Sequence, residues 1–303
     1  MKFTEEKLEK AFTELLGQEG FPHHLGITIA RKPDEVLIEE DLQTFLLTQY
    51  TGQGITVNEI KSIILQLKSL SASDLYESNK TFLKMLSDGF ILKREDRNQK
   101  DIYIQLIDYA GLSNQKQPKT DQLISIAADN EEKNFTTEGQ RIYEKDNNIY
   151  KFVNQLEILG SEKRIPDGIV YINGLPLVVF EFKSAIREEA TIYDAFKQLT
   201  VRYRRDIPEL FKYNAFCVLS DGINNKAGSF FAPYEFYYSW RRVAGLAKDV
   251  DGIDSMFTLI QGMFHKNRLR DIIRNFIYIP DSSKKNEKIV CRYPQYYAAR
   301  ALY

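Results

Sequence analysis

The stretch PDGIVYINGLPLVVFEFKSA, residues 166–185, constrains the fold of this chain more than any other. Two apolar runs flank Asn173-Gly174, and this pattern predicts a β-hairpin. The second run ends in charge, because Glu181 and Lys183 close it with one phenylalanine between them. A buried carboxylate and a buried ammonium are both costly unless they are paired or bound to something. The hairpin therefore predicts an ion pair or a binding site at its end.

The geometry of the turn decides whether a site can form. Residues two apart in a strand face the same way, so the two charged residues share one face of the strand. A two-residue turn would pair Ile172 with Leu175 and would place Asp167 on the opposite face. A three-residue loop, with Gly174 at the position that needs a positive φ, would bring Asp167 to the same face. If a site forms here, the loop between the two strands should therefore have an odd number of residues.

The convergence of these three residues would suit hydrolysis of a phosphodiester. Asp167 and Glu181 would repel each other at a few ångströms, which raises the pKa of one of them. Mg²⁺ relieves such repulsion, since it takes oxygen ligands and usually only one or two carboxylates, with water completing the shell. Lys183 could then position or activate the attacking water, or stabilise charge on the phosphate. The same residues could also form surface ion pairs only.

The composition excludes several classes of function. The chain carries a formal net charge of -1, so any surface that binds nucleic acid must be local. Cys217 and Cys291 form no CxxC or Cys/His cluster, which suits a reducing cytoplasm and predicts no zinc site. With three histidines, the chain is poorly supplied for a serine–histidine or histidine–metal enzyme. The first residues predict a charged helix and not a signal peptide, and no apolar run approaches the length of a membrane span.

Periodicity along the chain predicts helices and strands in alternation. Residues 4–17 predict an amphipathic helix with Thr4 as its N-cap. Residues 190–205 predict another helix and residues 214–220 a short strand, so that strand, helix and strand form a crossover unit. Other helical segments are expected around 35–50, 56–70 and 80–92 and through most of 235–303, and the polar stretch 113–122 predicts a loop.

Four stretches carry a resemblance to a known family: VNQLEILGSEKRIPDGIVYINGLPLVVFEFKSA, AFKQLTVRYRRDIPELFKYNAFCVLSDG, RDIIRNFIYI and RYPQYYAARAL. The first resembles the PD-(D/E)xK nuclease motif. Together they look like the amino-terminal nuclease domain of the restriction (HsdR) subunit of type I restriction–modification enzymes. The resemblance implies an α/β fold with a restriction-endonuclease-like core, in which helices flank a mixed central sheet, and additional mostly helical segments.

The resemblance also implies a division of the chain and a set of metal ligands. An endonuclease domain would occupy residues 1–240, with a helical insertion at about 30–130, and a helical linker over 241–303 would lead toward a helicase-like motor. Asp167, Glu181 and the backbone carbonyl of Phe182 would bind Mg²⁺, and Lys183 would be catalytic.

The first helix contributes a glutamate to the site in the family fold, and several glutamates compete for that role. At about 100° per residue, Glu9 and Glu5 lie at the edge of the apolar stripe, whereas Glu6 and Glu14 point further away. A site beneath the helix needs a carboxylate at that edge, so we expect Glu9, and then Glu5, to serve it. Early glutamates can also be solvated charges that favour the helix dipole.

The family carries a Gln-x-x-x-Tyr element on the helix after the E-x-K motif. Here Gln198 is followed at four residues by Arg202 and at five by Tyr203. Since side chains five apart do not share a face of an α-helix, the role of Tyr203 is in doubt, and Arg202 could replace it. We expect Gln198 near the scissile phosphate, and Arg202, Arg204 and Arg205 as candidate DNA phosphate contacts. Arginines at a helix end can also simply suit its dipole.

The last stretch bears on nucleotide binding. Gln295 resembles the glutamine that reads adenine ahead of a helicase motor, but no G-x-x-x-x-G-K-[ST] phosphate loop occurs in the chain. We therefore expect ATP to bind only to the full-length subunit and these residues to lack ATPase activity. The chain would be a fragment that ends where the motor begins.

The resemblance implies partners as well as an activity. These would be double-stranded DNA and the modification and specificity subunits of a cytoplasmic type I complex, with no membrane involved. We expect weak DNA affinity from the chain alone, because no long basic groove is evident. A free-standing nuclease of the same fold and a non-catalytic assembly module remain the alternatives.

Overall fold

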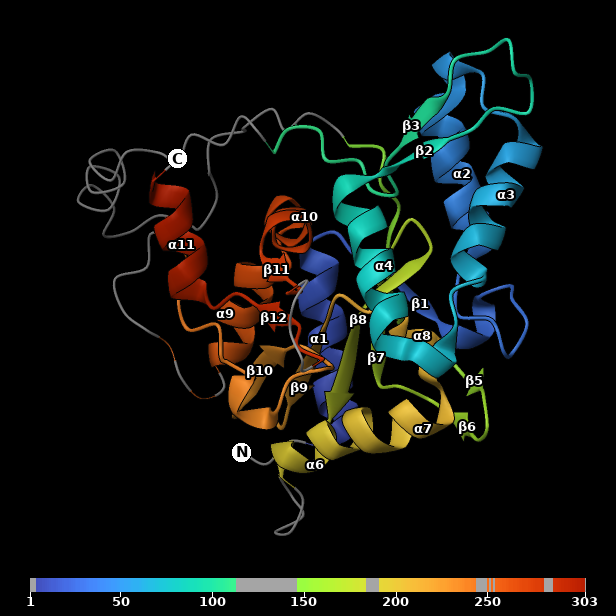
Figure 1. Cartoon of the computed structure of the whole chain (residues 1–303). Helices are drawn as coiled ribbons and strands as arrows, with labels where there is room; N and C mark the ends of the chain where they lie inside the picture. The colour runs from blue at the N-terminus through green and yellow to red at the C-terminus, as the bar shows by residue number, and fades with distance from the viewer. Residues whose placement is uncertain are drawn as a thin grey trace.

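The predicted hairpin lies at the centre of a six-stranded sheet in the computed structural model (Figure 1). The strand order is β1-β4-β7-β8-β9-β10; β1–β4 and β8–β9 are parallel pairs, and the other neighbours are antiparallel. This mixed sheet flanked by helices confirms the predicted fold class. The strands are β1 (His23–Leu25), β4 (Tyr150–Asn154), β7 (Gly168–Ile172), β8 (Leu175–Phe182), β9 (Phe216–Ser220) and β10 (Asn225–Gly228). The structure describes residues 4–112, 146–183, 191–243, 250, 252, 254–280 and 286–302.

Strands β7 and β8 are buried along their whole length, which explains their nearly continuous apolar sequence. Helix α1 (Glu5–Gln18) covers one face of the sheet. Its Phe12 ring stacks on Phe182 at a centroid distance of 4.7 Å and meets the edge of Phe180 at 5.7 Å. Side chains alternate along a strand, so Glu181 points to the opposite face, where the helical segment that begins with α6 (Ile192–Lys197) contacts β8.

The turn between β7 and β8 has two residues, so the predicted odd-numbered loop is wrong. Ile172 pairs with Leu175, and Asn173 and Gly174 have φ values of 53° and 73°, as in a type I′ turn. A β-bulge then corrects the register. Val170 pairs with Val178 and the residue next to it pairs with Pro176, so one residue of β8 has no partner. Beyond the bulge the strands are again in the register that a site requires.

The longer predicted helices are present close to their expected bounds. Thr4 accepts a hydrogen bond from the Lys7 N–H at 3.2 Å and caps α1, as predicted. Thr56 and Glu59 form a capping box that fixes the start of the third long helix. The other long helices are α2 (Glu39–Tyr50), α3 (Val57–Lys68), α4 (Leu75–Asp88), α9 (Asp254–Met263), α10 (Lys266–Asn275) and α11 (Tyr293–Leu302).

Short elements complete the described chain. They are β2 (Phe90–Leu92), β3 (Ile102–Ile104), β5 (Ile158–Leu159), β6 (Lys163–Arg164), β11 (Ile277–Tyr278), β12 (Ile289–Val290), α7 (Arg204–Asp206), α8 (Pro208–Phe211), a π-helical turn (Gln198–Tyr203) and four 3-10 turns (Gly26–Thr28, Thr51–Gln53, Ala72–Asp74, Tyr234–Phe236). The β8-α6-β9 connection joins parallel strands, which confirms the predicted crossover unit. The predicted loop at 113–122 lies outside the described residues, and the predicted domain division stays a prediction. Of the helices described, none is both long enough and apolar enough to cross a membrane.

Candidate active site at the end of the central hairpin

Two carboxylates converge where β7 begins and β8 ends. Gly168 pairs with Phe180, and continuing that register by one residue places Asp167 opposite Glu181. Residues opposite each other in an antiparallel pair share one face of the sheet. The Phe182 N–H donates to Asp167 Oδ2 at 2.5 Å, which fixes the aspartate against the end of β8. The bulge thus produces the convergence that the turn alone would prevent.

Lys183 lies at the same place. Its ammonium donates to Glu181 Oε1 at 2.9 Å and to the Phe182 carbonyl oxygen at 2.9 Å. Glu181 is fully buried, whereas the Lys183 side chain keeps 15% of its surface exposed. Glu181 Oε2 is buried and accepts no hydrogen bond from any described residue. One oxygen of a buried carboxylate therefore remains unsatisfied, which is unusual in a protein interior.

Burial raises the pKa of both carboxyl groups above their ordinary values. Burial, with the neighbouring Asp167 charge, raises the pKa of Glu181 well above its ordinary value, and Lys183 offsets only part of this. Burial also raises the pKa of Asp167 to about 6, although the Phe182 N–H and Lys183 favour its charged form. The pair therefore holds protons more tightly than free carboxyl groups do, and a cation would relieve the repulsion.

The donor set fits the predicted Mg²⁺. It consists of the two carboxylates and the carbonyl of Phe182, all oxygen ligands, with one orphaned oxygen on Glu181. In the part of the chain that the structure describes, no group of three or more His, Cys, Asp and Glu side chains could hold a metal ion. Water would have to complete the shell, as is usual for Mg²⁺. The Lys183 ammonium contacts two of these ligand groups, so it and a bound cation would compete for the same oxygens.

Both candidate glutamates of α1 lie close enough to Asp167 to raise its pKa. Glu9 is held in place, because its Oε1 accepts hydrogen bonds from Asn154 Nδ2 at 2.6 Å and from Gln155 Nε2 at 3.0 Å. Gln155 has a φ of 52°, a conformation that is uncommon outside glycine and often occurs at functional sites. These two hydrogen bonds to Glu9, here called the amide clamp, were not predicted, because no local sequence pattern indicates them. The role of Glu9 stays a prediction.

A π-helical turn over Gln198–Tyr203 brings both of its end residues to the site. In a π-helix the hydrogen bonds run from i to i+5, so side chains five apart share a face. Gln198 Nε2 donates to the Tyr203 hydroxyl at 2.9 Å, and the hydroxyl donates to the Ile165 carbonyl at 3.3 Å. The nearby Tyr203 hydroxyl offsets part of the rise in the pKa of Glu181, and burial together with the Glu181 charge raises the pKa of Tyr203. The doubt about Tyr203 rested on α-helical geometry, which does not apply here.

The three predicted arginines lie in different environments. Arg202 is exposed, and its side chain makes no hydrogen bond or ion pair with any described residue. The Arg204 guanidinium lies 4.6 Å from the centroid of the Phe230 ring and donates to the Phe230 carbonyl at 3.2 Å. Arg205 donates to the buried Asp206 at 2.6 Å. Arg202 is therefore the one of the three whose side chain has no hydrogen-bond or ion-pair partner among the described residues.

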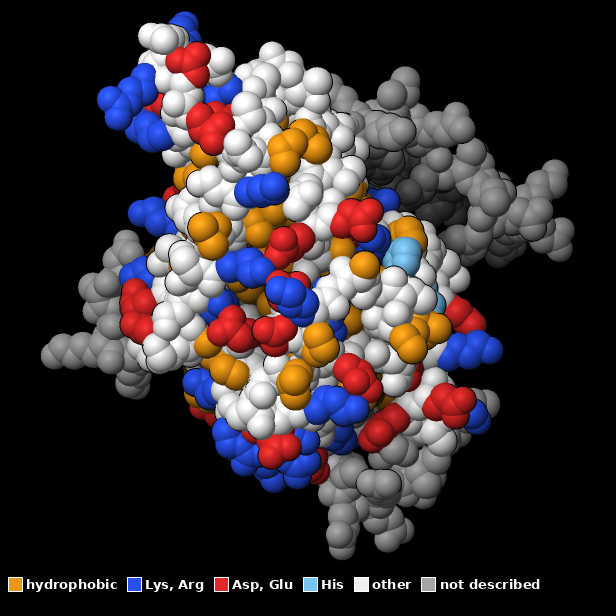
Figure 2. All heavy atoms as spheres, turned by 90° about the vertical axis from the view of Figure 1, so that its right-hand side faces the viewer, with side chains coloured by type: hydrophobic (Ala, Val, Ile, Leu, Met, Phe, Trp, Pro, Cys, Tyr) orange, Lys and Arg blue, Asp and Glu red, His pale blue; other side chains and the backbone are white. Residues whose placement is uncertain are grey.

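Charges of both signs cover the face of the molecule seen in Figure 2. Lys and Arg side chains gather near its lower edge, at the height at which Figure 1 shows β6 and α7. No wide field of one sign covers this face, and any steering of DNA toward it has to be local.

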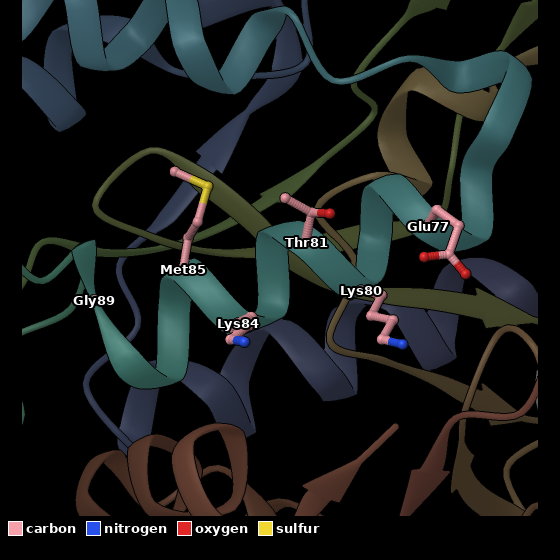
Figure 3. A pocket seen from close by; sticks show the side chains of 6 residues that line it. All are labelled: Glu77, Lys80, Thr81, Lys84, Met85 and Gly89. Atoms are coloured by element: carbon pink, nitrogen blue, oxygen red, sulfur yellow. The ribbon is translucent and has the colours of Figure 1, made fainter. Parts of the chain in front are cut away.

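Two further features, the exposed Gln295 and a hollow along α4, have fewer groups that could take part in a reaction. Gln295 is exposed in the first turn of α11, where its Oε1 accepts the Arg292 N–H at 2.9 Å, and its predicted contact with adenine stays a prediction. A hollow of about 300 Å³ along α4 is lined by Glu77, Lys80, Thr81, Lys84, Met85 and Gly89 (Figure 3). Five of these six belong to one helix and their charges are mixed, so the α4 hollow has no convergent acidic pair.

Comparisons with known proteins bear on the family of the chain. The profile of the family described as "Type I restriction enzyme R protein N terminus" matches residues 2–236. The chain is 32% identical over 244 residues to the type I restriction enzyme HindI endonuclease subunit of Haemophilus influenzae, which covers 78% of this chain and 20% of that protein. It is 26% identical over 249 residues to a putative type I restriction enzyme MjaIXP endonuclease subunit of Methanocaldococcus jannaschii, which covers 75% of this chain and 20% of that protein. The chain thus spans about a fifth of the length of these relatives.

Proposed function

The chain belongs to the type I restriction enzyme R protein N-terminal family, and from this premise we propose that it is a Mg²⁺-dependent endonuclease domain. Its substrate would be double-stranded DNA, and its reaction the hydrolysis of a phosphodiester bond. The modification and specificity subunits of a type I complex would direct it to DNA, and ATP would be used only by a motor part of the full-length subunit.

One observation carries the proposal: the fully buried Glu181 lies opposite Asp167, has one unsatisfied oxygen, and is contacted by Lys183. A surface ion pair would be exposed and satisfied by solvent, and would cost little. A buried pair of like charges with one lysine is costly, and a fold retains such a group where function needs it.

The residues of the chain would divide the work of hydrolysis. Asp167, Glu181 and the Phe182 carbonyl would hold Mg²⁺, which when bound supplies positive charge that stabilises the phosphate oxygens in the transition state. Lys183, once its ammonium leaves Glu181, would orient the attacking water and stabilise charge on the phosphate. The water oxygen forms the new bond to phosphorus and gives up a proton to the surrounding water, the bond to the leaving sugar oxygen breaks, and that oxygen takes up a proton from the surrounding water. Gln198 and Tyr203 would position the strand.

The test is cleavage together with cation binding. Supercoiled plasmid is incubated with the assembled type I complex and Mg²⁺, with wild type or with Glu181→Gln. The glutamine keeps the buried volume but removes the charge, so we expect folding to persist and cleavage to be lost. Calorimetric titration of the chain with Mn²⁺, as a probe of the site, should show binding that this variant loses. Persistent cleavage by the folded variant would refute the proposal. A wild-type chain that binds no cation and supports no cleavage would favour the assembly module instead.

A further inference from the structure

A hollow of about 270 Å³ adjoins the carboxylate pair, and the proposed reaction gives its basic lining residues no role. It is lined by Lys163, Arg164, Ile165, Gln198, Arg202 and Tyr203. Strand β6 and the following Ile165 form one wall and the π-helical turn the other, and the hydrogen bond from the Tyr203 hydroxyl to the Ile165 carbonyl joins the two walls. Only Pro166 separates Ile165 from Asp167, so the hollow adjoins the site.

One cation of the hollow is fixed. Arg164 Nε donates to Asp206 Oδ2 at 2.6 Å, and Asp206 is fully buried. Arg205 and Arg164 lower the pKa of Asp206 to about 2, so it stays ionised and holds Arg164 in place across the neutral range. The Arg164 side chain still has 33% of its surface exposed. A guanidinium that is oriented by one carboxylate loses little side-chain entropy when it binds a second anion.

Two other cations can move toward a ligand. Arg202 is exposed and has no side-chain partner among the described residues. Lys163 contacts Glu157 at 3.1 Å, but both side chains are more than half exposed, and such pairs are weak. The amide of Gln198, which donates to the Tyr203 hydroxyl, adds a neutral hydrogen-bonding group to the lining. The hollow thus combines a fixed guanidinium with two adjustable positive charges.

We infer that this hollow binds a backbone phosphate of the DNA strand, next to the phosphate that is cleaved; the inference rests on the proposed function. A phosphodiester has one negative charge and several acceptor oxygens, which suits two guanidinium groups and an ammonium. The volume lies just below the usual range for small-molecule sites, so it suits a phosphate with part of a sugar better than a whole nucleotide. The lining offers no array of groups to read a base edge, so the contact positions the strand without selecting sequence.

The hollow changes which basic residues we expect to contact DNA. Arg202 remains a DNA contact, but Arg164 and Lys163, which precede the PD motif, join it. Arg205 then acts indirectly, because its ion pair with Asp206 supports the carboxylate that orients Arg164. This group of basic residues is not evident from the sequence, because its members come from segments about forty residues apart.

The test compares two double variants that remove the same charges. Lys163→Gln with Arg202→Gln alters the hollow, whereas Lys93→Gln with Arg97→Gln removes one exposed lysine and one exposed arginine near β2. Binding of a fluorescent duplex to the chain is followed by anisotropy in EDTA at several salt concentrations. We expect the variant with Lys163→Gln and Arg202→Gln, called the hollow variant, to bind the duplex more weakly. The magnitude of its slope of log K against log salt should decrease by about two, or about one for each lost phosphate contact. The control should keep the wild-type slope.

The outcomes separate this inference from the proposed function. Equal slopes for the two double variants would overturn the inference, even if the wild-type protein cleaves DNA. A reduced slope in the hollow variant alone would support it, even if cleavage is never seen. Sodium phosphate is the remaining arm: calorimetric binding of inorganic phosphate that the hollow variant loses, with no displacement of the duplex from the wild-type chain, would make the hollow a free-anion site and overturn the inference.

Discussion

Replacement of Asp167 by asparagine should stabilise the folded protein at pH 8 but not near pH 4. Asparagine keeps the shape of the side chain, and its carbonyl oxygen can still accept the Phe182 N–H. What it removes is the charge that burial disfavours and that repels Glu181. Most point mutations cost stability, so a gain that appears only where the carboxylate is ionised would reveal the cost of the buried charge.

The pKa of Asp167 gives the sign and the size of the effect. The folded-state pKa is raised from 3.8 to about 6, so the folded state binds this proton more tightly than the unfolded state. The wild type therefore keeps the stability from this group below pH 3.8 and loses it as the pH rises through about 6. At about 1.4 kcal/mol per pH unit, the shift amounts to roughly 3 kcal/mol at pH 8, as an upper limit. The variant should thus gain about 1–3 kcal/mol at pH 8 and almost nothing near pH 4.

Urea unfolding measures this difference. Trp240 is the single tryptophan and is buried, so its fluorescence reports on the core, and far-ultraviolet circular dichroism gives an independent probe. Differences between variant and wild type are compared, because other groups, such as buried Lys288 with a pKa lowered to about 7, shift both curves alike. Mg²⁺ should raise the midpoint of the wild type at pH 8 more than that of the variant. An asparagine variant that is destabilised equally at both pH values would refute the reasoning.

Three further predictions concern neighbouring features. Lys183→Met should lower the urea midpoint at pH 8 but not at pH 5, because Glu181 loses the cation that offsets its charge; equal losses at both values would contradict this. Deletion of the exposed Val201 should convert the π-helical turn to α-helix and put Gln198 and Tyr203 four residues apart, the spacing at which α-helical side chains share a face, so cleavage by the assembled complex should be retained; loss of cleavage with unchanged circular dichroism would show that the π-helical turn itself is required. Gly174→Ala should cost about 2 kcal/mol or more in urea unfolding, since φ is +73° and a Cβ would meet the Ile38 carbonyl oxygen at 2.1 Å; a midpoint equal to that of the wild type would count against the turn geometry.

The parts of the fold that local sequence determines could be predicted. Helix α1 follows from one capping residue and one apolar stripe, and the hairpin follows from Asn173-Gly174 between two apolar runs. The correct register could not be predicted from the turn alone, because the bulge adds a residue farther along β8. Pro176 was the available signal, since proline inside a sheet is found at edges and bulges.

The candidate site was predicted only as far as regular geometry extends. Asp167, Glu181 and Lys183 were identified from their spacing, although for the wrong turn. With α-helical hydrogen bonds throughout, Tyr203 would not share a helix face with Gln198, so the sequence leaves its role in doubt. A five-residue spacing does not by itself predict a π-helical turn. The amide clamp on Glu9 depends on contacts between residues far apart in the chain, which no local pattern contains.

The packing of α1 on the central hairpin has a consequence for the order in which this chain can fold. Phe12 contacts Phe182, and His23 in β1 pairs with Phe152, so α1 and β1 meet partners that the ribosome makes much later. Contacts so distant in sequence form slowly, because a long loop must close before they stabilise anything. Helices α2 and α3 contact each other locally and can form early. Until the hairpin arrives, the apolar face of α1 is exposed, so this nascent chain is most vulnerable to aggregation and proteolysis before residue 182 leaves the ribosome.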